Sequence, residues 1–307
     1  IQRDHLGSPQ EAIRLYERLS PEAMAAPEIQ DVLEPLYEQT ERWRELAAHL
    51  NRKLSRQASA DAVQTHLRLG RLYGGRLEDP ETGIHHLSAA LKLDPDQAVA
   101  TEELDRYLED PAMRSRVAEL LEPVFAAVAD WNRLIQIQEI RLADADDDGS
   151  RMRILMRIAQ IEEEQLEDLE RAMTSYERLF REQPTSRRVR DQLSRLSGVL
   201  GQTERYAALL TDYVQEEGAD DNTDDMLVVV REAADLWAGI LRQPERAVPL
   251  LQRIRNANPE ERQVFTSLES VLTHAEMWPE LGALYWSEVD GALEEERQIE
   301  VLRKLAT

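Results

Sequence analysis

The chain contains no cysteine. Disulfide bonds, Cys-ligated zinc and thiolate catalysis are therefore excluded. A chain without thiols suits oxidising and reducing surroundings equally, so this absence leaves the compartment open. The cytoplasm is slightly favoured, and no signal peptide is visible. The chain starts at Ile1 rather than Met, which indicates that a natural N-terminus is missing.

Residues that interrupt helices are scarce, with 12 glycines and 13 prolines in 307 residues, and aromatic residues make up 5%. Runs of β-branched residues are almost absent, and the longest, Val228-Val229-Val230, lies within a helical pattern. This composition predicts an all-α fold. No apolar run approaches the roughly 20 residues that span a bilayer, so we expect no membrane insertion.

Basic residues are in the minority: 37 of them face 60 acidic residues, and the net charge is −23. Such a chain repels phosphate backbones and anionic membranes, so nucleic acid is not expected as a partner. Acidity also keeps an extended molecule soluble, and we favour that use over a dedicated site for basic partners.

One pattern occurs four times around a small residue. The small residues are Ala12, Gly83, Ala172 and Ala247. Apolar residues follow seven positions later, at Leu19, Ala90, Leu179 and Ile254. Proline follows twelve positions after three of the small residues, at Pro95, Pro184 and Pro259. This spacing places the apolar residues on one helical face, the small residue lets a neighbouring helix approach, and proline ends the helix.

Three of these small residues are preceded, thirteen positions earlier, by another small residue: Gly70, Ala159 or Ala234. Two helices with facing small residues form a closely packed hairpin. The pattern resembles the tetratricopeptide repeat, and its best copy runs Leu69, Gly70, Tyr73, Gly83, Leu87, Ala90, Leu91 and Pro95. This copy departs by one residue in the turn. The resemblance implies an all-α, right-handed α-solenoid of stacked antiparallel helical hairpins, with about 16 helices.

A second hairpin follows each copy, marked by an aromatic residue with leucine three positions later. The pairs are Trp43/Leu46, Trp131/Leu134, Tyr206/Leu209 and Trp278/Leu281, with leucines ten positions earlier at Leu33, Leu121, Leu196 and Leu268. The aromatic-first helix is also faintly similar to the half-tetratricopeptide repeats of RNA-processing scaffolds, but the remaining positions do not match.

We expect one continuous superhelix over residues 1–307, with units at about 1–58, 59–148, 149–222 and 223–294 and the start of another at 295–307. An insertion near 107–119 lengthens the second unit. One added helix there predicts a local change in superhelix direction. Both ends of the chain fall inside hairpins, which predicts a fragment of a longer repeat protein.

Motifs that carry chemistry are weak. Asp144, Asp146, Asp148 and Gly149 reproduce the opening of a calcium loop, but Leu155 stands where the loop needs a glutamate, so a helix-capping linker is favoured. His85 and His86 point apart on a helix, and Gly74-Gly75 lacks the sequence context of a phosphate loop. No catalytic signature is present. We therefore expect no enzyme activity, no cofactor and no metal.

The five tryptophans fall into two groups. Trp43, Trp131 and Trp278 occupy repeat positions and are expected in the core. Trp237 and Trp286 have no counterpart in the other units, so they are candidates for exposed partner-binding anchors.

The first helix of each hairpin lines the concave groove in tetratricopeptide proteins. The resemblance thus implies a non-catalytic scaffold that binds a partner segment with solvent-facing residues of 63–76, 153–165 and 228–240. These residues include Arg71, Gln160, Glu163, Glu164 and Asp235. The clamp that holds C-terminal carboxylates in chaperone-binding members is absent, because its places read Leu67/Arg71, Met156/Gln160 and Arg231/Asp235.

The expected partner is a protein or peptide, presented as a basic or an apolar helix. A regulatory or sensor segment controlling an enzyme domain elsewhere in the full-length chain is the alternative. An RNA-binding solenoid is disfavoured by the net charge of −23.

Overall fold

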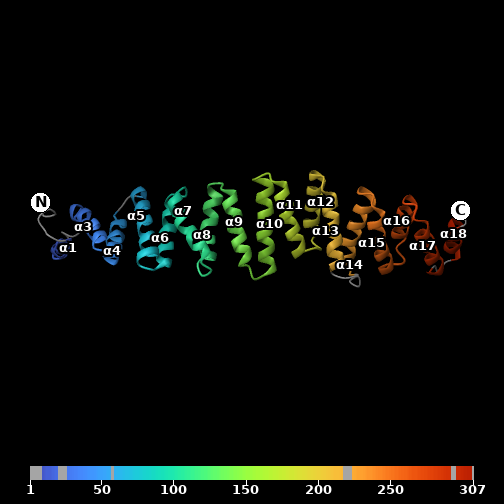
Figure 1. The fold of residues 1–307 in the computed structure, drawn as a ribbon, viewed down its shortest axis with the longest axis horizontal. Helices are drawn as coiled ribbons and strands as arrows, with labels where there is room; N and C mark the ends of the chain where they lie inside the picture. The colour runs from blue at the N-terminus through green and yellow to red at the C-terminus, as the bar shows by residue number, and fades with distance from the viewer. Residues whose placement is uncertain (1–8, 20–25, 57–58, 217–222, 292–294, 306–307) are drawn as a thin grey trace. The chain divides into compact units, whose positions relative to one another are not determined.

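The computed structural model describes residues 9–19, 26–56, 59–216, 223–291 and 295–305. These residues form seventeen α-helices and no strand (Figure 1), which confirms the all-α prediction. The chain divides into two compact units, Ile1–Ala145 and Asp146–Thr307. The division falls within the acidic linker at 142–150. A single continuous superhelix over both units stays a prediction.

Helices in the first unit pack against their neighbours in chain order. They are α1 (Pro9–Tyr16), α3 (Pro27–Gln39), α4 (Trp43–Leu54), α5 (Ser59–Arg71), the π-helical turn η1 (Leu72–Arg76), α6 (Pro80–Leu93), α7 (Ala98–Asp105), the 3-10 turn η2 (Arg106–Glu109), α8 (Arg114–Ala127) and α9 (Trp131–Ala143).

The second unit follows the same plan. Its helices are α10 (Asp148–Glu164), α11 (Leu169–Glu182), α12 (Arg187–Leu200), α13 (Thr203–Glu216), α14 (Asp224–Asp235), the π-helical turn η3 (Leu236–Ile240), α15 (Pro244–Ala257), α16 (Arg262–His274), α17 (Trp278–Gly291) and α18 (Glu295–Leu305).

The small residues lie where paired helices meet. Gly83, Ala172 and Ala247 are all buried, as the repeat predicts. A β-carbon on Gly83 would lie 3.0 Å from the backbone nitrogen of Gly74 and 3.1 Å from the carbonyl oxygen of Gly70. The backbones of α5 and α6 are therefore in close contact, and a side chain at this position would require them to move apart by a few tenths of an ångström.

Each of the three hairpins of this kind closes with the same turn. The residue five positions before the small residue has a left-handed backbone: φ is 53° at Glu78, Glu167 and Arg242. The next N–H then reaches back to the end of the first helix, at 2.9 Å from Asp79 to Tyr73 and at 2.8 Å from both Asp168 to Glu162 and Gln243 to Trp237. The helices after two of these turns begin at Pro80 and Pro244, and proline suits the first helical position.

The second hairpins use a different common turn. A left-handed residue ends the first helix at Glu41, Ala129, Gly201 and Glu276. The following N–H bonds to a carbonyl five residues back, as in a Schellman motif, at 2.7–3.0 Å.

This turn corrects the repeat register in the third unit. The next helix begins two residues after the left-handed residue, at Trp43, Trp131, Thr203 and Trp278. Thr203 therefore occupies the aromatic position, and Tyr206 corresponds to Leu46. The predicted alignment was wrong by three residues, because a shift of three leaves an apolar residue on nearly the same helical face.

The insertion in the second unit is a short helix. α8 carries Leu121 and corresponds to α3, so α7 with η2 is the added element. This confirms one additional helix. It begins at Ala98, earlier than the predicted 107–119, a range that holds most of η2, the turn after it and the first residues of α8.

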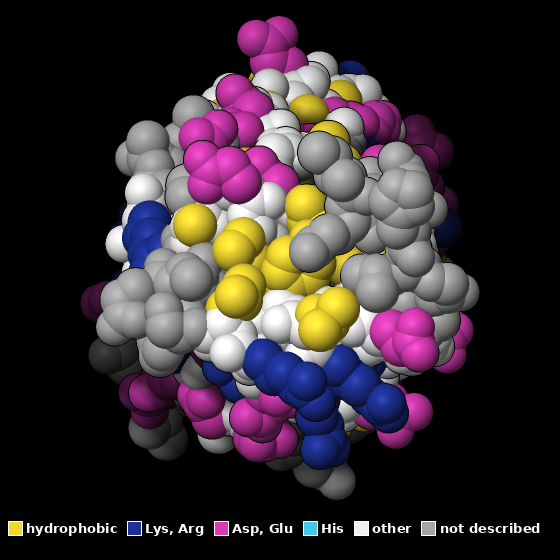
Figure 2. Space-filling view, turned by 90° about the vertical axis from the view of Figure 1, so that its left-hand side faces the viewer, with side chains coloured by type: hydrophobic (Ala, Val, Ile, Leu, Met, Phe, Trp, Pro, Cys, Tyr) yellow, Lys and Arg dark blue, Asp and Glu magenta, His cyan; other side chains and the backbone are white. Residues whose placement is uncertain are grey.

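Two predicted core positions are exposed instead. α1 ends at Tyr16, so Leu19 lies beyond the helix and is 39% exposed. Figure 2 shows apolar side chains gathered on the surface at this end of the first unit, with charged side chains around them. Trp278 is 57% exposed. Its counterpart Trp43 is half-buried, and the guanidinium carbon of Arg76 in η1 lies over its ring.

We expect Gly83→Ala to separate α5 from α6, because the added methyl group would meet the α5–η1 backbone at 3.0–3.1 Å. The free energy of unfolding should fall by about 1–3 kcal/mol relative to Gly75→Ala, measured by urea unfolding followed by circular dichroism. Gly75 is the matched control, since a β-carbon there has no neighbour within 4 Å. Equal unfolding midpoints for the two variants would contradict the close packing.

Candidate functional site

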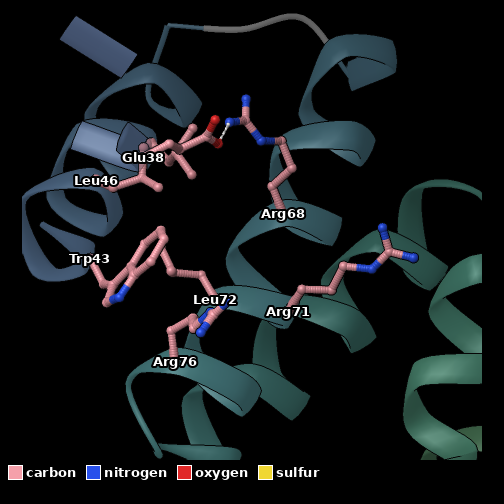
Figure 3. Close-up of a pocket in the computed structure, with 8 residues that line it drawn as sticks. Glu38, Trp43, Leu46, Arg68, Arg71, Leu72 and Arg76 are labelled. Atoms are coloured by element: carbon pink, nitrogen blue, oxygen red, sulfur yellow. Dashed lines mark hydrogen bonds and ion pairs between the residues drawn. The ribbon is translucent and has the colours of Figure 1, made fainter. Parts of the chain in front are cut away.

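A groove of about 430 Å³ opens in the first unit between α4 and the end of α5 (Figure 3). Its lining residues come from four elements. They are Glu38 of α3, Trp43, Leu46 and Leu50 of α4, Arg68 and Arg71 of α5, and Leu72 and Arg76 of η1.

The helix period brings the α5 and η1 residues to the groove. Arg68, Leu72 and Arg76 are spaced by four residues and therefore follow one face. The helix widens at η1, where the N–H of Leu77 bonds to the carbonyl of Leu72 at 3.0 Å. Leu72 itself is buried, whereas Arg71 and Arg76 are exposed.

The floor of the groove is apolar and one wall is aromatic. Leu46 and Leu50 are buried, and Trp43 is half-buried beside them. The guanidinium carbon of Arg76 lies 5.1 Å from the centroid of the Trp43 ring (Figure 3). This distance is within the range of a cation–π interaction. The groove thus combines apolar contact with a cation held at its rim.

Arginines and carboxylates form ion pairs around the rim. Arg68 pairs with Glu34 and with Glu38, the latter at 2.5 Å between Nη2 and Oε1 (Figure 3). Nε of Arg71 lies 2.9 Å from Oε1 of Glu103. Glu34 and Glu103 are shared, because Glu34 also contacts Lys53 at 3.2 Å and Glu103 contacts Arg106 at 2.8 Å.

Positive charge therefore exceeds negative charge here. Four cations (Lys53, Arg68, Arg71 and Arg106) share three carboxylates (Glu34, Glu38 and Glu103), and Arg76 pairs with none of them, so these eight groups carry a net charge of +2. This local excess contrasts with the chain as a whole, whose net charge is −23.

Glu34 is the carboxylate with the most contacts in this ion-pair network. Contacts with His49, Arg68 and Lys53 hold the pKa of its carboxyl well below the ordinary value, against the opposing effect of burial. Nε2 of the buried His49 lies 3.4 Å from Oε2 of Glu34, at the long limit of hydrogen bonding. Glu34 therefore remains ionised and keeps Arg68 at the groove.

The predicted partner-binding residues are divided between the two units. Arg71 lies in the groove of the first unit. In the second unit, Glu163 of α10 pairs with Arg195, Gln160 is half-buried, and Glu164 is exposed. Asp235, at the end of α14, is also exposed. No described cavity gathers these four residues.

The two tryptophan anchors have opposite environments. Trp286 is 56% exposed, as predicted. The prediction for Trp237 was wrong, because it is 0% exposed and its Nε1–H donates to Oγ1 of Thr211 at 2.9 Å. Trp237 stands three residues after Ala234, just as Tyr73 follows Gly70. The repeat itself therefore contained the signal that this residue belongs to the packed hairpin.

The sequence interpretation also missed Arg68, Arg76 and Trp43 as groove residues. Trp43 was placed in the core because it repeats. The three arginines Arg68, Arg71 and Arg76 lie within nine residues, and this clustering was a visible signal, since only 37 of 307 residues are basic.

A second hollow, of about 570 Å³, lies in the second unit beside η3. It is lined by Ala238, Gly239, Arg242, Pro244, Ser270, Val271, His274 and Ala275. Ala238 corresponds to Gly74 of the first unit, which the Tyr107 hydroxyl contacts closely. Most residues that line this hollow are small, and only one is an arginine. It therefore offers a partner less apolar contact and fewer cations than the groove does.

Carboxylates of the acidic linker at 142–150 are used in contacts within the protein. Asp144 forms ion pairs with Arg114, and Asp147 caps α10 by accepting from the Ser150 N–H at 2.8 Å. Leu155, at the glutamate position of a calcium loop, is buried. Within the described ranges, no group of three or more His, Cys, Asp or Glu residues is arranged to hold a metal ion.

His66 and His86 of the first unit pack together between α5 and α6. Nδ1 of His66 lies 3.0 Å from Nδ1 of His86, whose ring stacks on Tyr73. Burial, together with the neighbouring His66 and His85, lowers the pKa of His86 to about 4. His86 is therefore neutral near pH 7 and serves packing. Among the described helices, none has the length and apolarity to cross a membrane.

No family model and no curated protein matches the chain. Similar solved structures include Naa15/Naa10 bound to HypK-THB, with 13% identity over 88% of this chain and 38% of that one and a TM-score of 0.35. Yeast Tom70 has 13% identity over 91% and 60% of the two chains, with a TM-score of 0.29. A TPR repeat-containing protein from Cytophaga hutchinsonii has 15% identity over 85% and 94%, with a TM-score of 0.27. The likeness is one of helical-repeat architecture. The chain spans less than two thirds of the Naa15/Naa10 and Tom70 chains that it matches.

We expect Glu34→Gln to lower the free energy of unfolding at pH 7 by about 1–3 kcal/mol, because a charged hydrogen-bonded group is lost. Since the folded pKa of Glu34 lies below the ordinary 4.5, its stabilisation is fully present above that value and is lost as pH falls toward the lowered one. The variant should therefore lose less stability than the wild type between about pH 5 and 3 in urea titrations. Glu119→Gln, an exposed change in α8, is the control, and parallel pH curves for wild type and Glu34→Gln would contradict the assignment.

Substitutions of Trp237 and Trp286 in the second unit should have very different effects on stability. Trp237→Ala removes a fully buried ring and should cost about 3–5 kcal/mol of unfolding free energy. Trp286→Ala removes a side chain that is 56% exposed, and it should change stability by no more than about 0.5 kcal/mol. Urea unfolding of both variants tests the pair, and similar losses would show that Trp286 is packed as well.

Proposed function

We propose that this chain is a non-catalytic protein-interaction module, and that the groove between α4 and α5–η1 holds a segment of a partner protein. The observation that carries the proposal is the groove itself, in which an apolar floor lies under solvent-accessible guanidinium groups. Binding sites commonly combine a mostly apolar surface with a few placed polar groups. Tryptophan and arginine, which form the wall and rim, are the residues most enriched in binding hot spots.

The chemistry of the groove favours binding over catalysis. Its lining contains no serine, threonine, lysine or histidine. The only carboxylate among the lining residues is Glu38, which is paired with Arg68 at 2.5 Å. Arginine stays protonated and cannot act as a base near neutral pH. Recognition of a surface is the function that these side chains serve best.

The position of the groove agrees with a helical-repeat scaffold. α5 is the first helix of its hairpin, the element expected to meet a partner, and it contributes Arg68 and Arg71. Solvent-facing residues of α10 and α14, including Glu163 and Asp235, are proposed as further contacts. Trp286 is proposed as an exposed anchor in the second unit.

Peptide selection tests this proposal. A random library of about 16-residue peptides displayed on phage and panned against the whole chain should yield binders with Kd in the micromolar range, about 1–100 µM. Bound peptides should slow amide hydrogen exchange in α4 and in α5–η1.

Trp43→Ala should weaken the binding of these peptides about tenfold, as expected for loss of a hot-spot residue. Trp278→Ala is the matched control, because it removes an exposed tryptophan from the second unit and should leave binding unchanged. Protection confined to other helices, or equal binding by the Trp43→Ala variant, would rule out the groove.

A further inference from the structure

We infer that the groove selects an acidic segment, in which carboxylates of the partner pair with Arg71 and Arg76 while an apolar side chain rests on Trp43. The inference rests on the proposed function and adds the chemical class of the partner. It differs from the basic helix suggested by net charge, because the local charge of the groove has the opposite sign.

Donors at the rim remain available. Arg71 uses Nε for Glu103, at 2.9 Å, and its terminal Nη groups make no hydrogen bond within the described part of the chain. Its side chain extends away from Trp43, on the far side of Leu72 (Figure 3). The Arg71 side chain is 55% exposed. A carboxylate can therefore reach the two Nη groups end-on, through two parallel N–H···O bonds.

Arg76 offers a second cation. It is exposed, lies over the Trp43 ring at 5.1 Å, and forms no ion pair with a described residue. A cation that rests on an aromatic ring keeps its N–H donors at the ring edge. One partner carboxylate at Arg76 would thus lie next to an apolar contact on Trp43. Arg68 is different, because Glu34 and Glu38 already occupy it.

The balance of charge sets the sign of selectivity. With five cations and three carboxylates, the rim gains by binding negative charge, whereas a basic helix would place like charges against Arg71 and Arg76. At physiological salt the Debye length is about 8 Å, so the acidic remainder of the chain is largely screened from a ligand in the groove. The local charge of the groove therefore determines which peptides bind more tightly.

Charge-matched peptides test the inference on the whole chain. The probes are fluorescein-labelled peptides of about twelve residues in which leucines alternate with Glu, Gln or Lys. Fluorescence polarisation is measured at about 0.15 M salt. The Glu peptide should bind at least about tenfold more tightly than the Gln peptide, and the Lys peptide should bind weakest.

Variants locate the effect. The double variant Arg71→Ala/Arg76→Ala should reduce Glu-peptide binding at least about tenfold and remove the preference over Gln. Arg71→Glu/Arg76→Glu should bind the Lys peptide better than the wild type does. Arg187→Ala is the control: it removes an arginine of α12 whose side chain is 88% exposed, and it should leave the affinity for all three peptides unchanged. Circular dichroism checks that each variant is folded.

Several outcomes would overturn the acidic-segment inference. Equal binding of Glu and Gln peptides, tighter binding of the Lys peptide, or no binding of the Glu peptide would each do so. So would binding that requires phosphoserine in place of Glu, or an RNA oligonucleotide that competes for Arg71 and Arg76. The proposed function is judged separately, because library peptides of any charge that protect α4 and α5–η1 would uphold it.

Discussion

Gly83 lies against the backbone of α5 and η1, so closely that an added methyl group would be 3.0–3.1 Å from backbone atoms of Gly74 and Gly70. This contact of two helix backbones organises the first unit. It fixes the spacing of α5 and α6, leaves Leu87 packed over Gly70, and requires a short turn between the helices. Ala172 and Ala247 are buried at the same place in the other hairpins. Larger residues there would push the paired helices apart and expose the flanking leucines.

The turns show how closely the repeat is kept in the absence of strong sequence identity. Six non-glycine residues adopt left-handed backbone geometry, and each such residue costs roughly 1–2 kcal/mol. The cost is tolerated because the packed helices on both sides leave the chain no other path. Glutamate occupies four of these six positions, at Glu41, Glu78, Glu167 and Glu276. Each of these glutamates lies two residues before the start of the next helix, where the N-terminal end of the helix dipole favours negative charge.

The groove is a consequence of how α5 ends. The wide turn of η1 carries Leu72 inward and places Arg76 over Trp43. The end of the first helix of this hairpin therefore meets the start of α4. Ion pairs between different helices then decide which charges remain available. Arg68 is held by α3, whereas Arg71 and Arg76 keep donors exposed. An acidic protein can therefore present a cationic surface, because net charge averages over positions that never meet.

The sequence by itself determined the helices, their pairing and their ends. Small residues at fixed spacing and prolines after Leu93, Glu182 and Ala257 act through local geometry, which each segment carries alone. The tertiary structure decided which tryptophans are exposed and which arginines keep unpaired N–H donors. Trp237 and Trp286 both lie on amphipathic helices, yet only the packing of α13 against η3 buries the first. The register of the third unit and the free donors of Arg71 were likewise hidden, because a three-residue shift preserves a helical face and an ion pair depends on neighbours distant in the chain.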